Sequence, residues 1–451
     1  MPDGVGIKNY LYSSLIKHIS RNAKITIWSP LPIEAFDEVS DLHNIEISYK
    51  KLELQTESKL TRLFREAATY ARLKYNASKT DNNTILNNWR KPRNSFKLRL
   101  LYRLAEFIGR FASRDYNKIL KLERKSKQNW SNEIIDNYKK ELTVLKTDVL
   151  FITHQRVASI MPICLAAKVL QICSFTAIYS WDNPPKARMG VSTDYYLLWS
   201  DWMKNDMQLF YPEIASEQLK VVGTPQFEFY LHKNRIVSRK SFAEQYGLDE
   251  SCKWICFSGD DEYTSPHDPD YLHDVAEAIS KMNKSIQLIF RRCPVDFSTR
   301  YDNVIEKFNE LIISIDPIWH TDSEAWVGYF SKLEDVDLQV NLAYHCDGVI
   351  NLGSTMALDF ATLNKPCLYL NYDTVNDKNW STETIYKFHH FKSMANIDAV
   401  GWINAKAEIA EKINFLLLNK DKVGKDREKW LKTLVEHPLD YNALTIANIL
   451  K

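Results

Sequence analysis

The chain has 451 residues, with 59 Lys and Arg against 57 Asp and Glu, which gives a net charge of +2 at pH 7. This length exceeds one ordinary hydrophobic core and predicts two or more domains. With 45% hydrophobic and 26% charged residues the composition is that of a folded globular protein, which excludes a disordered chain. The small net charge excludes a general affinity for polyanions, so nucleic acid is not an expected partner.

The cysteines form no metal-binding or disulfide pattern. Their number is odd and no Cys-x-x-Cys spacing occurs, which is typical of reduced thiols in a cytosolic protein. The N-terminus lacks a signal peptide, and no apolar run approaches the length of a membrane span. We therefore expect a cytoplasmic protein.

Short β-branched or aromatic runs alternate with helical patterns along the chain, which predicts an α/β protein with parallel sheets. The runs of the first half lie at 25–28, 149–152, 176–179 and 219–222. The runs of the second half lie at 254–257, 286–290, 311–315, 348–350 and 367–370. Gly-Thr-Pro at 223–225 is a turn signal between the two series. We expect domains at 1–225 and 226–435, and a final helix within 436–451 that packs back on the first domain.

A strongly basic segment interrupts the first half. Residues 90–127 carry thirteen Lys and Arg against three acidic residues, and their apolar residues recur at helical spacing. Such an amphipathic helical insertion suits the surface of an anionic membrane. A domain-packing helix with a solvated basic face, or contact with another polyanion, are the alternatives.

The stretch GVINLGSTMALDF at 348–360 predicts a strand, a small-residue loop and a helix. Unpaired N–H groups at a helix start favour an anion such as phosphate, and Gly353 allows a ligand close approach while Ser354 and Thr355 add donors. Asp359 lies four residues after Thr355, so both share one helix face. An ordinary Ser/Thr helix cap would satisfy the same pattern.

The run HCDGVINLGSTMALDFATLNKPCLYLNYD at 345–373 resembles the donor-binding segment of GT-B glycosyltransferases, most closely those of bacterial surface-polysaccharide synthesis. SWDNPPKARM at 180–189 and VVGTPQFEFY at 221–230 resemble two other stretches of these enzymes. The spacing Ser354-Thr355-x-x-x-Asp359 also resembles the Ser-Ser-x-x-x-Asp of teichoic acid polyol-phosphate polymerases. The resemblance spans about 145–400 and implies a GT-B fold, in which two Rossmann-like domains face each other across a cleft.

The resemblance also implies roles on the donor side. Gly353, Ser354 and Thr355 would hold the diphosphate of a nucleotide sugar, and Asp359 would bind ribose or sugar hydroxyls. Two further groups follow predicted strands of the second half and would face the same ligand. They are the pair Arg291 and Arg292, which would neutralise the departing nucleotide, and the pair Ser258 and Gly259.

We expect no cofactor and no metal. The two Asp-x-Asp triplets, at 268–270 and 335–337, occur at the frequency that chance allows. Arginine can neutralise the leaving nucleotide in place of a divalent cation.

A general base must reach the acceptor hydroxyl from the opposing domain. Asp182 in SWDN is the first candidate, and Asp3 and His154 are the others. Asp3 lies in PDGVG, which resembles the glycine-rich loop after the first strand of GT-B folds. No strand precedes it here, so either the sequence is short at its N-terminus or the sheet lacks its usual first strand.

Together these patterns favour a metal-independent glycosyltransferase that moves a sugar from a nucleotide diphosphate sugar to a hydroxyl of a cell-surface glycan precursor, either a polysaccharide or a lipid-linked acceptor. A CDP-polyol phosphotransferase of the teichoic acid type and a sugar-nucleotide 2-epimerase of the same fold are the alternatives. We expect the enzyme in the cytoplasm, peripheral on the inner face of the membrane through the basic segment 90–127.

Overall fold

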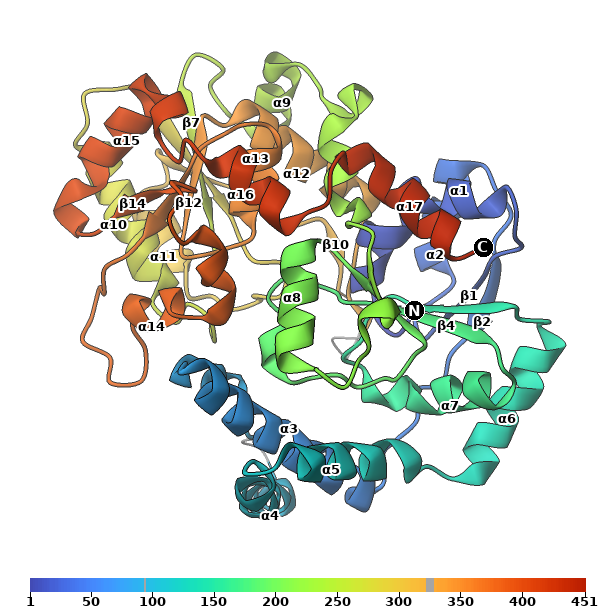
Figure 1. The fold of residues 1–451 in the computed structure, drawn as a ribbon. Coiled ribbons are helices and arrows are strands. Elements are labelled where there is room, and N and C mark those ends of the chain that lie inside the picture. The colour runs from blue at the N-terminus through green and yellow to red at the C-terminus, as the bar shows by residue number, and fades with distance from the viewer. Residues whose placement is uncertain (93–94, 322–327) are drawn as a thin grey trace.

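The computed structural model describes residues 1–92, 95–321 and 328–451. Each half of the chain contains one larger parallel sheet that carries helices on its faces (Figure 1). The first sheet has the order β3-β4-β5-β6 and the second the order β14-β13-β12-β7-β8-β9. The chain is therefore an α/β protein with two Rossmann-like sheets, as the alternating pattern predicts.

The first half begins with a small separate pair of parallel strands, β1 (Thr26–Ser29) and β2 (Ser48–Lys51). The four strands of the first sheet then follow. They are β3 (Val149–Ile152), β4 (Cys173–Ala177), β5 (Tyr195–Leu198) and β6 (Leu219–Val221). The helices of this half are α1 (Leu15–Ser20), α2 (Glu34–His43), α3 (Lys59–Thr80), α4 (Phe96–Ala112), α5 (Tyr116–Gln128), α6 (Asn132–Val144), α7 (Met161–Val169) and α8 (Asp201–Phe210).

The second half contains the six-stranded sheet and a short antiparallel pair, β10 (Trp319–His320) with β11 (Phe330–Ser331). The strands of the sheet are β7 (Lys253–Ser258), β8 (Ile286–Arg291), β9 (Ile312–Ser314), β12 (Gly348–Asn351), β13 (Cys367–Leu370) and β14 (Gly401–Ile403). The helices are α9 (Arg239–Tyr246), α10 (Asp268–Ser280), α11 (Asp302–Lys307), α12 (Leu333–His345), α13 (Met356–Thr362), α14 (Thr382–Tyr386), α15 (Ile409–Leu418), α16 (Arg427–Leu434) and α17 (Asn442–Ile449).

The core of the second sheet explains its sequence pattern. Every residue of β12 and β13 is buried, because helices cover both faces of the sheet, and such strands read as continuous apolar runs. A single cluster of buried side chains extends from this sheet through Phe227 and Phe229 to Ile7 and Ile27 in the first half. The two halves are thus joined by packed apolar contacts as well as by the chain.

The last helix returns to the first half. Ala443 and Ile446 of α17 are buried with Tyr10, Leu15 and Phe175, which belong to the first half (Figure 1). The carbonyl of Trp199 accepts a hydrogen bond from the backbone N–H of Glu436 as the chain crosses over.

The basic segment forms two helices, α4 and α5, with a break at residues 113–115. Together with α3 they make a layer at the lower edge of the view in Figure 1. A 3-10 turn, η2 (Asn83–Asn88), follows α3 in the chain. Its residue Thr84 and the preceding Asn82 donate hydrogen bonds to the carbonyl of Lys387 in the second half. The layer therefore touches both halves of the molecule.

Candidate functional site

The second sheet has a point where the strand order reverses. In chain order its strands run outward from β7 through β8 to β9, then restart on the other side of β7 with β12, β13 and β14. Ligands of open α/β sheets bind in the crevice outside the carboxyl ends of the two strands at such a point. The loops after β7 and β12 contain Asp260–Asp261 and Gly353–Thr355.

A cavity of about 300 Å³ opens at this place. The second sheet contributes both loops, the first half contributes Trp181, Asp182 and Lys186 after β4, and η2 closes one side. Small-molecule sites typically have this size or somewhat more, and they lie between domains. The cavity therefore brings the sequence-predicted Gly353, Ser354, Thr355 and Asp182 together.

The loop Gly353–Thr355 is shaped by a left-handed backbone. Gly353 has φ +73°, and a Cβ there would lie 2.8 Å from the Phe391 ring, so only glycine fits. The Ser354 N–H donates to Asn351 Oδ1 at 3.0 Å, and Thr355 is exposed at the start of α13 without capping it through its side chain. Because α13 has only seven residues, its dipole is small. The hydroxyls and N–H groups of the loop are the stronger argument for an anion.

Cationic side chains line the same cavity. Lys186 and Arg90 are both part of its wall, and Lys186 donates to Asp182. Burial alone would raise the pKa of Asp182, but Lys186 and His390 hold it well below its usual value. A carboxylate that ionises this readily is a weak general base. Asp182 is thus better suited to orienting Lys186 than to accepting a proton.

Asp3 and His154 form one buried pair. His154 Nδ1 lies 2.6 Å from Asp3 Oδ2, although 151 positions separate the two residues in the chain. The opposite ring nitrogen, Nε2, is buried and has no hydrogen-bond partner within the described residues. The Tyr179 ring packs on the imidazole, and the two ring centres lie 4.9 Å apart. A histidine whose Nδ1 is held by a carboxylate, with Nε2 buried and unpaired among the described residues, has the arrangement of an oriented general base, although neither His154 nor Asp3 is part of the cavity wall.

Asp359 lies on α13 but outside the wall of the cavity. Its oxygens accept hydrogen bonds from Tyr230 Oη at 2.8 Å and from Gln339 Nε2 at 3.4 Å. Gln339 Oε1 accepts in turn from Lys8 Nζ. Burial raises the pKa of Asp359. Burial also lowers the pKa of Lys8, and this effect outweighs the carboxylates of Asp359 and Asp335, which act to raise it.

Sequence reasoning missed Lys8, Tyr230 and Gln339. Two of them left a signal, since Lys8 follows PDGVGI and Tyr230 ends VVGTPQFEFY, a stretch that carries the resemblance. Ionisable groups with shifted pKa values concentrate at functional sites. The cluster of Lys8, Tyr230 and Asp359 is therefore a second candidate for a functional role, in addition to the cavity.

Comparison with solved structures identifies the architecture. A putative UDP-N-acetylglucosamine 2-epimerase from Listeria monocytogenes has a TM-score of 0.56 at 11% identity, with 99% of this chain and 93% of that chain covered. A Staphylococcus aureus MnaA–UDP co-structure has a TM-score of 0.54 at 11% identity, with the same coverage. A glycosyltransferase from Rickettsia africae has a TM-score of 0.53 at 9% identity, with 100% and 97% covered.

The chain has the GT-B-like fold. This agrees with the fold that the sequence resemblance implies. No protein-family model matches the sequence, and no curated protein does. At identities this low the similarity describes the fold and leaves the reaction open.

Within this GT-B-like fold the two arginines after β8 have different partners. Arg291 is buried and donates to Asp335 Oδ1 at 2.7 Å, while its Nη1 has no partner among the described residues. Arg292 bonds the Ser298 carbonyl and lies 3.6 Å from an Asp302 carboxylate oxygen. Arg291 thus has a buried nitrogen without a partner among the described residues, whereas Arg292 is held loosely by two carboxylates, and neither is part of the cavity wall.

Ser258 and Gly259 are not part of the cavity wall. Ser258 ends β7 and is buried, and a Cβ on Gly259 would lie 3.0 Å from Tyr301 Oη. The next residue, Asp260, lines the cavity in their place. Burial and the carboxylates of Asp261 and Asp268 raise the pKa of Asp260 to about 8. This side chain is therefore mostly uncharged at neutral pH and can donate a hydrogen bond.

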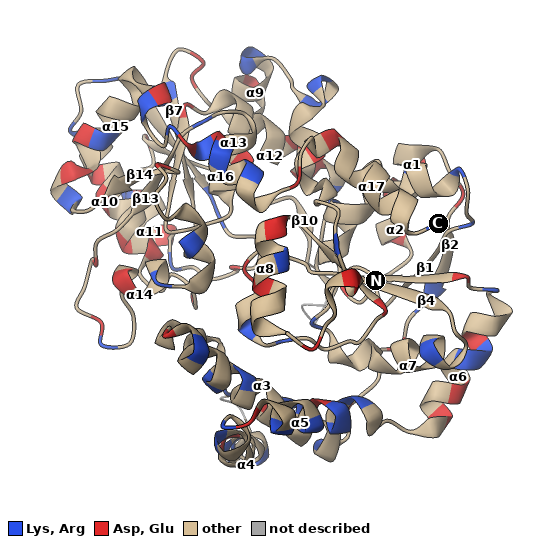
Figure 2. Cartoon of the chain, viewed as in Figure 1, with Lys and Arg blue, Asp and Glu red and all other residues tan. Residues whose placement is uncertain are grey.

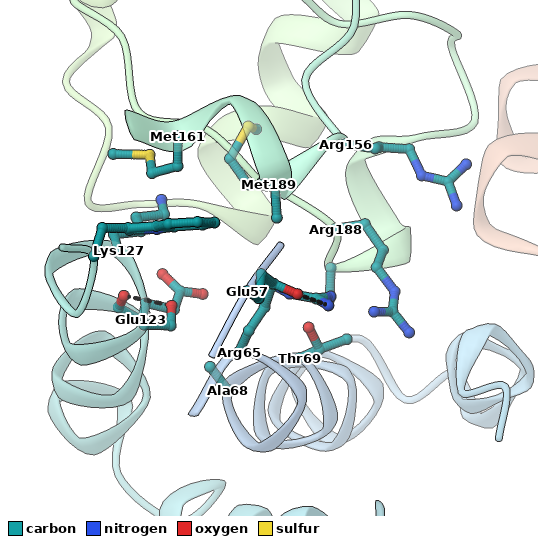
Figure 3. Close-up of a pocket in the computed structure, with 15 residues that line it drawn as sticks. Glu57, Arg65, Ala68, Thr69, Glu123, Lys127, Arg156, Met161, Arg188 and Met189 are labelled. Carbon is teal, nitrogen blue, oxygen red and sulfur yellow. Dashed lines mark hydrogen bonds and ion pairs between the residues drawn. The ribbon is translucent and has the colours of Figure 1, made fainter. Parts of the chain in front are cut away.

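Two other hollows are poorer candidates. The one drawn in Figure 3 has a volume of only about 30 Å³ and contains ion-paired side chains, with Arg65 Nε 2.7 Å from Glu57 Oε1. A larger hollow of about 470 Å³ is lined by Ser192, Thr193 and Asp194, which precede β5. It lies at the amino ends of the strands, the edge opposite to the one where α/β sheets bind ligands.

Proposed function

We propose that the cavity binds a nucleoside diphosphate sugar and that the protein is a glycosyltransferase acting on a hydroxyl acceptor. The observation that carries this proposal is the position of Gly353–Thr355 at the strand-order reversal, facing Lys186 and Arg90 across the cavity. Hydroxyls, backbone N–H groups and two cations suit a diphosphate. A ligand held between the halves would be oriented for reaction.

The proposed chemistry assigns one task to each group. The loop Ser354–Thr355 and Lys186 bind the diphosphate, and they stabilise its charge when the bond between the sugar carbon and the phosphate oxygen breaks. His154, oriented by Asp3, accepts the proton of the acceptor hydroxyl as that oxygen bonds to the sugar carbon. Lys8, Tyr230 and Asp359 belong to one hydrogen-bonded cluster that includes Gln339, and they would bind hydroxyls of the nucleotide sugar.

A second candidate is 2-epimerisation of a nucleotide sugar. It is favoured by the names of two of the similar structures, which are a putative UDP-N-acetylglucosamine 2-epimerase and a UDP-N-acetylglucosamine 2-epimerase. The same cavity and the same diphosphate contacts would serve it. The transferase is supported by a different observation, the resemblance of residues 345–373 to the donor-binding segment of GT-B glycosyltransferases. The polyol-phosphate alternative stays a prediction.

Turnover without an acceptor separates the candidates. The protein is incubated with UDP-N-acetylglucosamine alone, and the sugar protons are followed by NMR. For the transferase we expect slow release of UDP at most, with the sugar configuration at C2 unchanged. Accumulation of the 2-epimer would contradict the transferase and support the second candidate. Adding CDP-glycerol in a parallel sample tests phosphate transfer.

Binding is tested by thermal shift with UDP, GDP, CDP, dTDP and CDP-glycerol. A ligand at one hundred times its Kd stabilises the folded state by about 2.7 kcal/mol, which raises the melting temperature measurably. We expect UDP to do so, and we expect Ser354→Ala with Thr355→Val to remove the effect. Ser216→Ala, an exposed serine in the first half, is the matched control. An unchanged shift in the double variant would place the nucleotide elsewhere.

Asp260 predicts a pH dependence of this binding. Because its pKa is about 8, the side chain is neutral below that pH and becomes an anion beside the diphosphate above it. We expect UDP affinity to fall by about fivefold or more between pH 7 and pH 9, since charges a few ångströms apart repel by about 1 kcal/mol or more. Isothermal titration calorimetry measures this. Asp260→Asn should bind with nearly constant affinity over that range, and an unchanged slope in this variant would exclude Asp260 as the cause.

A further inference from the structure

Helix α4 exposes a continuous apolar stripe. Its five members lie three or four residues apart, so they share one side of the helix. They are Phe96, Leu100, Leu104, Phe107 and Phe111. Each is between 46% and 72% exposed, and the rings of Phe107 and Phe111 lie 5.0 Å apart. A contiguous exposed apolar surface of this kind marks an interaction site.

The stripe does not belong to the core of the protein. The opposite side of α4 carries the small and aromatic residues that are buried against α3, namely Tyr102, Ala105, Gly109 and Ala112. The contact is close, since a Cβ on Gly109 would lie 2.8 Å from the Ala67 carbonyl oxygen. Helix α4 is therefore apolar on two sides, and α3 covers only one of them.

Basic residues border the stripe. Lys97, Arg99, Arg103, Arg110 and Arg114 are all exposed. The guanidinium groups of Arg99 and Arg114 lie over the Phe96 and Phe111 rings, 5.9 Å and 5.7 Å from their centres. The only acidic residue of α4, Glu106, is half-buried and accepts a hydrogen bond from Trp89 Nε1. Figure 2 shows further Lys and Arg along the neighbouring α5.

We propose that this face of α4 docks on an anionic lipid bilayer. A surface that pairs exposed Phe and Leu with flanking Lys and Arg matches the acyl boundary and the acidic headgroups of such a bilayer. A second copy of the chain fits poorly, because a two-fold contact would place the same basic residues opposite one another. The phosphates of a nucleic acid would pair with the basic residues, but they would also lie against the apolar stripe, which they cannot solvate.

The position of α4 relates this face to the cavity. Helix α4 follows η2 in the chain, and η2 forms one side of the cavity. The same helical layer therefore carries the proposed bilayer face and one side of the cavity. Within the described residues, no helix combines the length and the apolar character that a membrane crossing requires, so the proposed attachment is at the surface.

Vesicle co-sedimentation tests the proposal on the full chain without any nucleotide, so the result is independent of the proposed function. The wild-type protein should bind vesicles of phosphatidylcholine mixed with phosphatidylglycerol at least about tenfold more strongly than vesicles of phosphatidylcholine alone. Phe107→Ser with Phe111→Ser should weaken binding to the anionic vesicles by at least about tenfold. Arg103→Glu with Arg110→Glu should do the same and should abolish the dependence on salt.

Matched controls carry the same changes at exposed positions elsewhere. Val169→Ser with Leu418→Ser, and Lys233→Glu with Lys240→Glu, should bind within about twofold of wild type. Circular dichroism verifies that each variant is folded. Absence of wild-type binding to the anionic vesicles would overturn the proposal, and so would equal binding by the Phe107/Phe111 variant. Self-association that this variant loses, without vesicle binding by wild type, would assign the face to a second copy instead.

Discussion

Replacing His154 by Gln should lower the turnover number by about 10² to 10⁴, the range that a general base contributes. Gln keeps the size and a hydrogen-bond donor for Asp3, so the buried pocket around the side chain stays filled. What is lost is the basic Nε2, which has no partner in the described part of the protein. Turnover of the nucleotide sugar identified by the binding screen is the measurement, with Kd for the nucleotide unchanged within about threefold, because His154 is assigned to the proton.

Two variants separate a base from a structural histidine. Asp3→Asn keeps the contact with Nδ1 but removes the charge that stabilises the imidazolium formed when His154 takes the proton, so it should lower the turnover number. His345→Gln removes another buried histidine, whose Nε2 lies 3.0 Å from the Val237 carbonyl oxygen, and should leave turnover unaffected. If His154→Gln retains the wild-type rate and pH profile, the pair only anchors the N-terminal segment.

The strands that sequence reasoning placed well are those buried on both faces. The apolar runs at 254–257 and 348–350 coincide with β7 and β12, because a central parallel strand must be apolar at every position. Strand β2 was missed, since its sequence SYKK is polar and half-buried or exposed. The run at 176–179 lies later than β4, because Ile178 and Tyr179 already belong to the loop.

In the candidate site, features that depend on neighbouring residues could be predicted from the sequence, and features that depend on distant segments could not. The loop Gly353–Thr355 was predictable, because its geometry depends on glycine and on the strand that precedes it. Asp260 was predictable only as part of the loop that follows the run at 254–257, because the exact end of the strand decides which side chain of Ser258, Gly259 and Asp260 faces the cavity. The Asp3–His154 pair depends on two segments 151 positions apart, and nothing in either segment indicates the other.

Replacing Arg72 by Met should destabilise the protein by about 3 kcal/mol, the lower end of the range for breaking a buried ion pair, because Arg72 is fully buried while the carboxylates of Glu123 and Glu213 stay partly exposed. Arg72 lies on α3 and is fully buried. Its Nε and Nη2 lie 2.7 Å from Glu123 and Glu213, and its Nη1 donates to the Phe210 carbonyl at 2.8 Å. These partners come from α5, from the last residue of α8 and from the segment just after it, so a single side chain joins the helical layer to the region around α8.

The pH dependence of this loss distinguishes the electrostatic effect from lost packing. Burial would raise the pKa of Glu123, but Arg72 holds it below its ordinary value in the native protein. The wild type therefore gains stability above that ordinary value and loses it as the pH falls through the lowered pKa. In Arg72→Met the burial effect is uncompensated, so Glu123 takes up a proton more readily, and the difference in unfolding free energy should shrink between pH 7 and about pH 4.

Urea denaturation of the two proteins at several pH values measures this difference, and two further variants test its cause. Adding Glu123→Gln to Arg72→Met should recover part of the stability, because it removes one of the uncompensated charges. Lys240→Met removes a cation from an exposed pair with Glu244 and should change the unfolding free energy by less than about 1 kcal/mol. A loss that is the same at every pH would mean that Arg72 acts through its packing on Tyr211, whose ring centre lies 4.5 Å from the guanidinium group. Helix α3 is followed by η2, which forms part of the cavity wall. If the ion pairs of Arg72 hold the whole helical layer in position, the Arg72→Met variant should lose nucleotide affinity as well as stability.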